Sequence, residues 1–323
     1  MVSIVYGQKT IKIASYNVDN LFDLHKNGHE YREYIPYTSL NWNQKNYKTK
    51  LTNLSKVIKD IDADIIALEE VESLKALKDL QYTLKRKDLY YNYYKIAGKK
   101  NTTVKVAFLS KIPFVYAKEL AVTSSYKYRN ILEVKFKLGK EYLYLFIVHF
   151  KAKSGAESKR IVSAKVLVKR IKELGDDKNI IILGDFNSHY EEYKVFLKKR
   201  KHNDTHGKTA INHILKTLKQ QKKASLVEYK KGEFYNLWYD VKKSQRYSYI
   251  YRRKKEVLDN FLISQSLLQK GGINYINNTF TPFDKKYLFK KKYLYRWQIS
   301  RKGKKHLGKG YSDHLPVVGS FSY

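Results

Sequence analysis

The chain has 323 residues, of which 65 are lysine or arginine and 30 are aspartate or glutamate, so its formal net charge is +35. It contains no cysteine, which excludes disulfide scaffolds, thiolate zinc sites and cysteine nucleophiles. No segment of the sequence approaches the run of about 20 apolar residues that a membrane-spanning helix needs.

Hydrophobic periodicity predicts alternating strands and helices through the first 183 residues. Apolar and polar side chains alternate over residues 10–18, which indicates a strand, and the apolar residues of 46–61 recur at helical spacing. Gly139 and Lys140 separate two alternating segments, which is typical of a β-hairpin. In chain order we expect a strand at 10–18, a helix at 46–61, strands at 64–68 and 104–110, a hairpin of 131–138 and 141–150, a helix at 157–174 and a strand at 179–183.

The last third of the chain is more basic, and its segments of regular hydrophobic periodicity are shorter. We expect two short basic helices at about 191–200 and 211–222, strands at 247–251 and 257–263 joined by a turn at 252–255, and a final strand at 316–321. No internal repeat, linker or break in composition divides the chain. We therefore expect one domain over residues 1–323, with mixed sheets, helices outside them and a flexible start at 1–9.

Acidic, amide and histidine side chains recur at or beside the ends of the predicted strands. Each position alone has an ordinary interpretation as turn chemistry or surface polarity. Side chains from several strand ends meet at one edge of a sheet, where a site is both rigid and open. The positions are Asn17, Glu70, His149, Asp185, Asn187, Asp259, Asp313 and His314.

These residue types indicate the chemistry of such a site. Carboxylate and amide oxygens without thiolates suit Mg²⁺ or Mn²⁺ better than zinc. Histidines add acid–base or phosphate-contacting capacity near neutral pH. The combination favours metal-assisted hydrolysis of a phosphoryl ester.

Six short segments closely resemble the signature blocks of the endonuclease/exonuclease/phosphatase superfamily. They occur in the family's order and span residues 11–318. The resemblance implies an α/β fold of the deoxyribonuclease I-like type, which is a four-layered α/β/β/α sandwich of two mixed β-sheets flanked by helices. The segments are 13–18 (IASYNV), 64–71 (DIIALEEV), 148–150 (VHF), 183–188 (LGDFNS), 258–264 (LDNFLIS) and 312–317 (SDHLPV).

The resemblance also implies a metal site. Glu70 is similar to the principal Mg²⁺ ligand of the family, with Asn17 close to it and Asp313 completing the metal region. Mn²⁺ or Ca²⁺ is expected to substitute for Mg²⁺ or to assist it. Glu69 departs from the glutamine that commonly precedes the metal glutamate, so it either modifies metal affinity or faces away.

Catalytic roles follow from the same resemblance. It implies that Asp185 orients the attacking water and that Asn187 holds the scissile phosphate. It further implies that His314 is a catalytic histidine oriented by Asp259, and that His149 contacts or protonates the phosphate.

Positive charge and interleaved aromatic residues favour a nucleic-acid partner. A net charge of +35 suits a polyanion, with lysine-biased codon usage as the alternative cause. The segment 285–310 contains many cations and no acid, and we expect it to be a basic aromatic insertion near the site, with a solvated loop as the alternative. Arg129 resembles a phosphate-contacting arginine of the family. The expected phosphate- and DNA-binding residues are Arg129, Lys290, Lys291, Lys292, Arg296 and Trp297.

The block 246–251 (RYSYIY) resembles that of bacterial, often secreted, non-specific deoxyribonucleases. We therefore expect a Mg²⁺-dependent endonuclease that cuts DNA with little sequence specificity. It would be a monomer without an obligate protein partner, secreted or periplasmic rather than cytoplasmic, with its leader absent from this chain. The alternatives are an abasic-site repair endonuclease, a lipid-headgroup phosphodiesterase or phosphatase, and a non-enzymatic nucleic-acid binder. His202, His206 and His213 are expected to be surface histidines rather than a second metal site.

Overall fold

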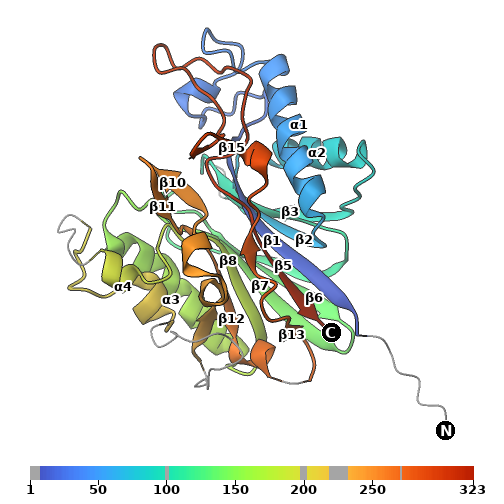
Figure 1. Ribbon diagram of the computed structural model, residues 1–323, viewed down its shortest axis with the longest axis vertical. Helices are drawn as coiled ribbons and strands as arrows, with labels where there is room; N and C mark the ends of the chain where they lie inside the picture. The colour runs from blue at the N-terminus through green and yellow to red at the C-terminus, as the bar shows by residue number, and fades with distance from the viewer. Residues whose placement is uncertain (1–7, 99–101, 197–201, 218–231, 270) are drawn as a thin grey trace.

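The computed structural model describes residues 8–98, 102–196, 202–217, 232–269 and 271–323. Two large β-sheets pack face to face, and helices cover the outer face of each sheet (Figure 1). This is the four-layered α/β/β/α arrangement of a deoxyribonuclease I-like fold, so the predicted fold class is confirmed. Within the described residues, no helix is both long enough and apolar enough to cross a membrane.

The first sheet has the strand order β13-β17-β1-β2-β4-β3, and β14 also pairs with β17. β1 and β2 are parallel, and the chain passes between them through the helix α1. Asn43 caps α1 by accepting the backbone amide of Asn46, and Ser73 caps α2 by accepting that of Ala76. The bounds are β1 (Thr10–Leu21), α1 (Gln44–Ile61), β2 (Ile65–Val71), α2 (Leu74–Lys85), β3 (Tyr93–Ile96), β4 (Lys105–Ser110), β13 (Asn274–Tyr275), β14 (Thr281–Pro282) and β17 (Val317–Ser322).

The second sheet has the strand order β5-β6-β7-β8-β12-β9. β6 and β7 form the predicted hairpin, in which Gly139 takes a positive φ of 59°. β7 and β8 are parallel, and the connecting helix α3 packs on the outer face of this sheet. The bounds are β5 (Phe114–Leu120), β6 (Ile131–Leu138), β7 (Glu141–His149), α3 (Glu157–Leu174), β8 (Asn179–Asp185), β9 (Phe234–Asn236) and β12 (Asp259–Ser264).

Three apolar clusters hold the four layers together. The inner faces of both sheets share the first cluster, in which Ile13, Phe108, Leu145 and Phe261 are fully buried. The second cluster joins the first sheet to α1 and α2, and the third joins the second sheet to α3. Complete burial of one such side chain stabilises the fold by about 1.5–3 kcal/mol. The sheets therefore form a firm support for residues at their edge.

The strand directions bring the predicted site residues to one edge of the two sheets. β1 and β2 run parallel in the first sheet, as β7 and β8 do in the second, so the carboxyl ends of each pair lie together. β12 is antiparallel to β8 and begins with Asp259 opposite Asp185. β17 is antiparallel to β1, so His314, which lies just before β17, reaches the same edge.

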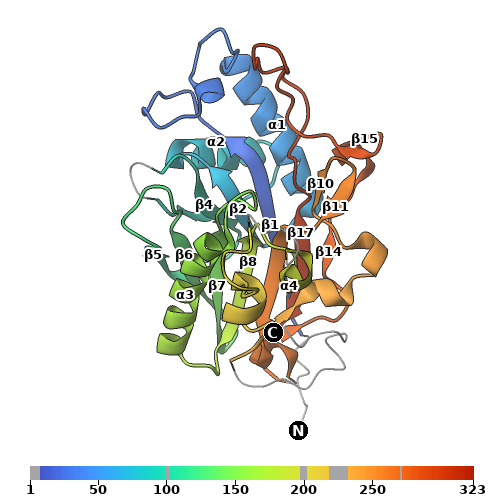
Figure 2. The ribbon, with the colours of Figure 1, turned by 90° about the vertical axis from the view of Figure 1, so that its left-hand side faces the viewer.

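Two small hairpins replace part of the predicted pattern near the end of the chain. β10 and β11 form a hairpin whose turn lies within the predicted turn at 252–255, and the predicted strand at 257–263 begins only at Asp259, as β12. Arg252 and Arg253 form the tight turn with φ values of 46° and 69°. The Nε of Arg253 donates to the hydroxyl of Tyr293 at 2.9 Å, which places the β15–β16 hairpin beside β10–β11 (Figure 2). The bounds are β10 (Tyr249–Tyr251), β11 (Lys254–Glu256), β15 (Phe289–Lys290) and β16 (Tyr293–Leu294).

The two predicted basic helices also differ from the structure. The helix α4 is a single turn, and 197–201 lies outside the described residues. The second begins as a π-helical turn, η2, which Thr209 caps by accepting the amide of Asn212, and 218–222 lies outside the described residues. α2, β3, β5 and β9 have no counterpart among the predicted elements. The remaining bounds are η1 (Arg32–Tyr34), α4 (Glu192–Val195), η2 (Ala210–Ile214), η4 (Leu237–Asp240), η5 (Lys243–Gln245), η6 (Gln265–Leu268) and η7 (Lys286–Leu288).

Candidate active site

An open cleft of about 720 Å³ lies at the edge where the strand ends converge. Two further predicted residues, Asn17 and Asp259, are buried beneath the cleft, where they bond to Asp185 and His314 respectively. The structure thus brings together residues from both sheets that are up to 297 positions apart (314 − 17). The predicted residues that line the cleft are Glu70, Arg129, His149, Asp185, Asn187, Arg296, Asp313 and His314.

Unusual backbone conformations occur at several of these positions. Glu70, Asn187 and Asp19 have positive φ values of 66°, 49° and 51°. Such a conformation costs a residue other than glycine on the order of 1–3 kcal/mol, and it persists only where the surroundings enforce it. Gly184 has a φ of 132°, and a Cβ there would lie 2.1 Å from the carbonyl oxygen of Val148. Glycine is therefore required for β7 and β8 to approach each other just before the cleft.

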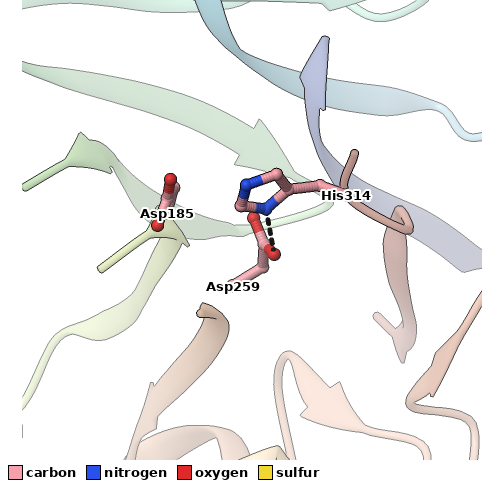
Figure 3. A group of neighbouring side chains, drawn as sticks. All are labelled: Asp185, Asp259 and His314. Atoms are coloured by element: carbon pink, nitrogen blue, oxygen red, sulfur yellow. Dashed lines mark hydrogen bonds and ion pairs between the residues drawn. The ribbon is translucent and has the colours of Figure 1, made fainter. Parts of the chain in front are cut away.

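His314 and Asp259 form a buried pair (Figure 3). His314 Nδ1 donates to Asp259 Oδ2 at 2.8 Å, and Figure 3 shows the imidazole ring directly above Asp259, with Asp185 to its left. The His314 amide donates to Ser312 Oγ at 3.0 Å, which fixes the start of this segment. Burial lowers the pKa of His314, but the charge of Asp259 and its hydrogen bond outweigh burial and raise the pKa well above its usual value. The raised pKa favours the imidazolium form, and Nε2 of the ring lies 3.9 Å from Asp313 Oδ1.

Asp185 connects the two sheets across the cleft. Its Oδ1 accepts the Asn187 amide at 2.8 Å, and its Oδ2 accepts from Asn17 Nδ2 at 3.1 Å. His149 Nε2 lies 3.4 Å from the same Oδ2. Burial raises the pKa of Asp185 to about 7, although the charge of His314 opposes the rise. This carboxyl group can therefore exchange a proton near neutral pH.

Carboxylates crowd the remaining part of the cleft. Glu70 Oε1 accepts from Asn17 Nδ2 at 3.3 Å, and burial together with the charge of Asp313 raises the pKa of Glu70. Burial and Asp313 likewise raise the pKa of Asp19 to about 7. The carboxylates of the cleft therefore repel one another, and burial makes their charge more costly. We call this set of carboxylates the acidic floor; it consists of Asp19, Glu70, Asp185, Asp259 and Asp313.

The acidic floor fits a hard divalent cation. Its donors are carboxylate and amide oxygens, the ligands that Mg²⁺ and Mn²⁺ prefer. Asp185, Asp259 and His314 each offer an atom within 4.8 Å of the others, and Asp259 Oδ1 is buried without a hydrogen-bond partner among the described residues. His314 Nδ1 already donates to Asp259, however, so it is not available as a metal ligand. Oxygen ligands on the Glu70 side of Asp185 therefore fit a cation better than the imidazole does.

Lys50 lies beside the acidic floor and has no counterpart in the sequence prediction. It is fully buried on α1, and its Nζ donates to the carbonyls of Asp19 at 2.8 Å and Tyr311 at 3.2 Å. It thereby ties the end of β1 to the segment that carries Asp313. Burial lowers the pKa of Lys50 to about 8. The sequence signal for its burial was its position next to Leu51 and four residues before Leu54, on the buried face of α1.

Glu69 and Tyr249 also bear on the site. Glu69 does not line the cleft; it is fully buried, and its Oε1 accepts from Ser15 Oγ at 2.9 Å. Burial and the charge of Asp259 raise the pKa of Glu69 well above its usual value, which favours the protonated form of this carboxyl group. Tyr249 lines the cleft with its ring 4.9 Å from that of His314. The sequence signal for Tyr249 was the resemblance of the segment 246–251 to the corresponding segment of bacterial deoxyribonucleases.

Cations surround the acidic floor at the mouth of the cleft. Arg296 contacts the floor through its Nη2, which lies 3.3 Å from Asp313 Oδ2. Arg129 Nη1 donates to the Phe150 carbonyl at 3.2 Å. We call the cationic residues that line the cleft the basic rim; they are Arg129, Lys153, Arg252, Lys254 and Arg296.

The other predicted DNA-binding residues lie outside the cleft. Residues 290–292 are exposed on and beside the β15–β16 turn and do not line it. Trp297, which the sequence placed among the expected DNA-binding residues, is only 2% exposed. Its Nε1 donates to His306 Nδ1 at 2.8 Å, and its ring packs edge-on against Trp42. The sequence around Trp297 did not indicate that Trp42, 255 residues earlier (297 − 42), would pack against it.

The three histidines of the 202–213 segment do not behave alike. His206 is exposed and His213 is partly exposed, as expected of surface residues. His202 instead lines the cleft, with its Nδ1 3.2 Å from the Gly155 carbonyl. Among the described residues, none of the three belongs to a cluster suited to a metal ion.

Comparisons with known proteins point to one family. A sequence model of the endonuclease/exonuclease/phosphatase family matches residues 12–321. TDP2 from D. rerio, whose crystal structure contains a single strand DNA product, has a TM-score of 0.59 at 14% identity over 97% of this chain and 99% of that chain. ANGEL2, a 2',3'-cyclic phosphatase, has a TM-score of 0.57 at 16% identity over 98% and 96% of the two chains. A mannosyl-6-phosphatase from Bacteroides thetaiotaomicron has a TM-score of 0.54 at 15% identity over 97% and 100%. Such identities show a shared fold alone, and no curated protein sequence matches this chain.

Proposed function

The chain belongs to the endonuclease/exonuclease/phosphatase family, whose members are hydrolases acting on phosphoester bonds, and from this premise we propose that it is a divalent-metal-dependent phosphodiesterase that cuts DNA. One observation carries the proposal. The acidic floor, with the hydrogen-bonded Asp259 and His314, lies inside a ring of cations in an open cleft. A metal-loaded floor suits the chemistry of a phosphodiester, and the basic rim suits a polyanionic substrate.

Glu70 and Asn17 would hold the metal ion, with Asp313 beside them. Asn17 already bonds to both Glu70 and Asp185, so it fixes the spacing of two potential ligands. A divalent cation supplies Lewis-acid polarisation of a phosphoryl oxygen and compensation of its developing charge. Lys50 donates to the carbonyl of Asp19 and so steadies the end of β1 on that side of the site.

Asp185 and His314 would share the proton transfers. Asp185 has a pKa of about 7, which suits a group that takes a proton from water near neutral pH. Asp259 favours the cationic form of His314, whose Nε2, 3.9 Å from Asp313 Oδ1, can stabilise the negative charge on the phosphoryl oxygens or protonate the leaving oxygen. Asp185 ends β8 in the second sheet and His314 precedes β17 in the first, so the two groups come from different sheets.

His149, Asn187 and Arg129 would position the phosphate. Burial, together with the charge of Arg129, lowers the pKa of His149 well below its usual value, so its ring is neutral. A neutral imidazole suits a hydrogen bond to phosphate better than proton delivery. Asn187 Nδ2 donates to the Phe150 carbonyl at 3.2 Å, which holds its amide at the cleft.

The shape of the basic rim favours a polymer over a small phosphoester. The β10–β11 hairpin carries Arg252 and Lys254 at the mouth, and the β15–β16 hairpin extends this cationic surface beyond the cleft. A small phosphate ester would use only the cations next to the floor. A single strand DNA product is bound in the crystal structure of the similarly folded TDP2, which also supports a nucleic-acid substrate.

The test is incubation of the full chain with supercoiled plasmid in Mg²⁺ and in EDTA, next to the His314→Ala variant. The exposed His206→Ala variant is the matched control. We expect nicking that requires Mg²⁺, survives in His206→Ala and disappears in His314→Ala. Intact plasmid with Mg²⁺ and with Mn²⁺ would reject the proposal. Parallel assays on abasic DNA, a lipid-headgroup diester and a sugar phosphate would then identify which alternative phosphoester the cleft hydrolyses.

A further inference from the structure

A second hollow, of about 630 Å³, is lined by residues of α1 and α2. These two helices cover the outer face of the first sheet (Figure 1). The hollow shares no lining residue with the catalytic cleft. We call it the α1–α2 groove. The helices that form its walls are held in place from below, because their buried faces pack on the first sheet in one apolar cluster.

The spacing of the lining residues makes each wall one helix face. On α1, Gln44, Tyr47, Lys48 and Leu51 follow each other at intervals of three, one and three residues, and on α2 the set of 75, 79, 82, 83 and 86 recurs at similar spacing. Side chains three and four residues apart lie on the same side of a helix. The groove is therefore built from two facing helical surfaces rather than from a loose loop.

The groove carries uncompensated positive charge. Its lining includes Lys48, Lys75, Arg86 and Lys87 but only one acid, Asp79. Asp79 Oδ2 already accepts from Lys75 Nζ at 2.8 Å and from the hydroxyl of Tyr47 at 2.8 Å. Among the described residues, the other three cations form no ion pair with a carboxylate.

Further lysines crowd one end of the groove. Lys59 Nζ donates to the carbonyl of Lys87 at 2.6 Å, and Lys87 Nζ donates to the carbonyl of Thr52 at 3.2 Å. Burial, with the charges of Lys56 and Lys59, lowers the pKa of Lys87. An anion placed there would relieve this mutual repulsion.

Two exposed tyrosines flank these cations. Tyr37 is 68% exposed and Tyr82 is 64% exposed, so both rings are available to a ligand. The Tyr37 amide donates to the carbonyl of Trp42 at 2.8 Å, which holds its loop in a defined turn. Leu51 is buried in the wall of the hollow. Aromatic faces beside cations are the combination that binds unpaired bases and their phosphates.

We propose that the α1–α2 groove binds a short single-stranded segment of nucleic acid, with Lys48, Arg86 and Lys87 contacting phosphates and Tyr37 and Tyr82 stacking on bases. The hollow has the volume of a small-ligand pocket, so it admits one or two nucleotides and not a duplex. An acidic peptide would satisfy the cations but would leave both tyrosine faces unused. The groove is separate from the cleft, so the proposal is independent of what the cleft cleaves.

Binding of a fluorescein-labelled oligothymidylate, measured by fluorescence anisotropy, tests the proposal. The His314→Ala background prevents cleavage during the measurement. Tyr82→Ala with Arg86→Ala removes one ring and one cation from the groove, and Tyr142→Ala with Lys140→Ala removes the same groups from an exposed hairpin. We expect the groove variant to bind about 10-fold more weakly and to lose about 0.7 from the slope of log affinity against log salt. The control variant should change affinity less than about 2-fold, within the range of surface substitutions.

Equal affinities and salt slopes in the two double variants would overturn the proposal. A fluorescein-labelled glutamate-rich peptide provides the second arm. If that peptide binds and loses affinity in the groove variant while the oligonucleotide does not, the ligand is an acidic polypeptide and the proposal is wrong. Tyr82 and Arg86 are both exposed, so the groove variant should keep the melting temperature of the unsubstituted protein. When the same two substitutions are made in the protein that retains His314, its rate of hydrolysis of a small chromogenic phosphodiester should match that of the unsubstituted chain. A failure of cleavage would contradict the proposed function without affecting the groove.

Discussion

The acidic floor and the basic rim share one cleft but carry opposite charge. The floor collects five carboxylates in a chain with only 30 acidic residues, and it does so where burial makes their charge costly. The rim carries five of the 65 cations, mainly on exposed loops and hairpins. Fold stability explains neither arrangement. Under the proposed function the floor would hold a cation and the rim a polyanion, and Arg296, which lies 3.3 Å from Asp313, is the residue at which the two meet.

The largest expected effect comes from Asp185→Asn in the floor. The substitution keeps the shape and the Asn187 contact but removes the proton-accepting carboxylate. General-base contributions are typically 10²–10⁴-fold, so kcat for plasmid nicking should fall by about 10³-fold. Asp284→Asn, at an exposed position outside the cleft, is the control. A loss of less than about 10-fold in Asp185→Asn would remove this carboxyl from the proton transfer.

Glu70→Gln should change the metal requirement. The amide keeps one oxygen donor but removes a negative charge from the floor, so the Mg²⁺ concentration for half-maximal activity should rise about 10- to 100-fold, a range seen when metal sites lose a supporting group. The Mg²⁺ dependence of nicking measures the change. An unchanged midpoint would mean that Glu70 is not part of the metal site.

Lys50→Met tests whether Lys50 supports the backbone beside the acidic floor without taking part in the reaction. Methionine fills much of the same space but leaves the carbonyls of Asp19 and Tyr311 without their donor. Leaving buried acceptors unpaired costs about 1–3 kcal/mol, so urea should unfold the variant at a lower concentration. Removing a cation beside the floor should also lower the Mg²⁺ midpoint. Unchanged unfolding together with an unchanged midpoint would show that Lys50 supports neither.

The smallest effect is expected at the rim. Arg252→Ala with Lys254→Ala removes two cations from the mouth of the cleft and none from the floor. The KM for DNA should rise several-fold while kcat stays constant, because the substitutions remove phosphate contacts but no group of the floor. Each lost phosphate contact should also reduce the slope of log affinity against log salt concentration by about 0.9. Steady-state kinetics at several salt concentrations measure both. A fall in kcat without a change in slope would assign these residues to the chemistry instead.

The sequence predicts the floor better than it predicts the surroundings. The long strands and α3 follow from clear apolar periods, and once their order and the family resemblance are known, Asn17, Glu70, Asp185 and His314 belong at one edge. α2 also had a usable signal, since Ser73 caps a helix whose buried face includes Leu77, Leu80 and Leu84.

Other features depend on tertiary contacts that composition does not reveal. The turn at Arg252 and Arg253 takes positive φ values without glycine or asparagine, so its residues do not specify the tight β10–β11 hairpin that forms within the predicted turn at 252–255. Trp297 and Arg296 are adjacent in a basic segment, yet one is buried and the other lines the cleft. Lys50 occupies a buried position that charge alone assigns to solvent, because its partners are carbonyls brought together only by the fold.

The most direct test of the central claim compares metal occupancy with cleavage. Mn²⁺ binding to the full chain is followed by electron paramagnetic resonance, while plasmid nicking is measured at the same free Mn²⁺ concentrations, in the unsubstituted protein and in Glu70→Gln. We predict that occupancy and nicking rise together, and that both shift to higher Mn²⁺ in the variant. Nicking that persists in EDTA, or Mn²⁺ occupancy that Glu70→Gln leaves unchanged, would contradict the assignment of the acidic floor as the metal-binding centre of a phosphodiesterase.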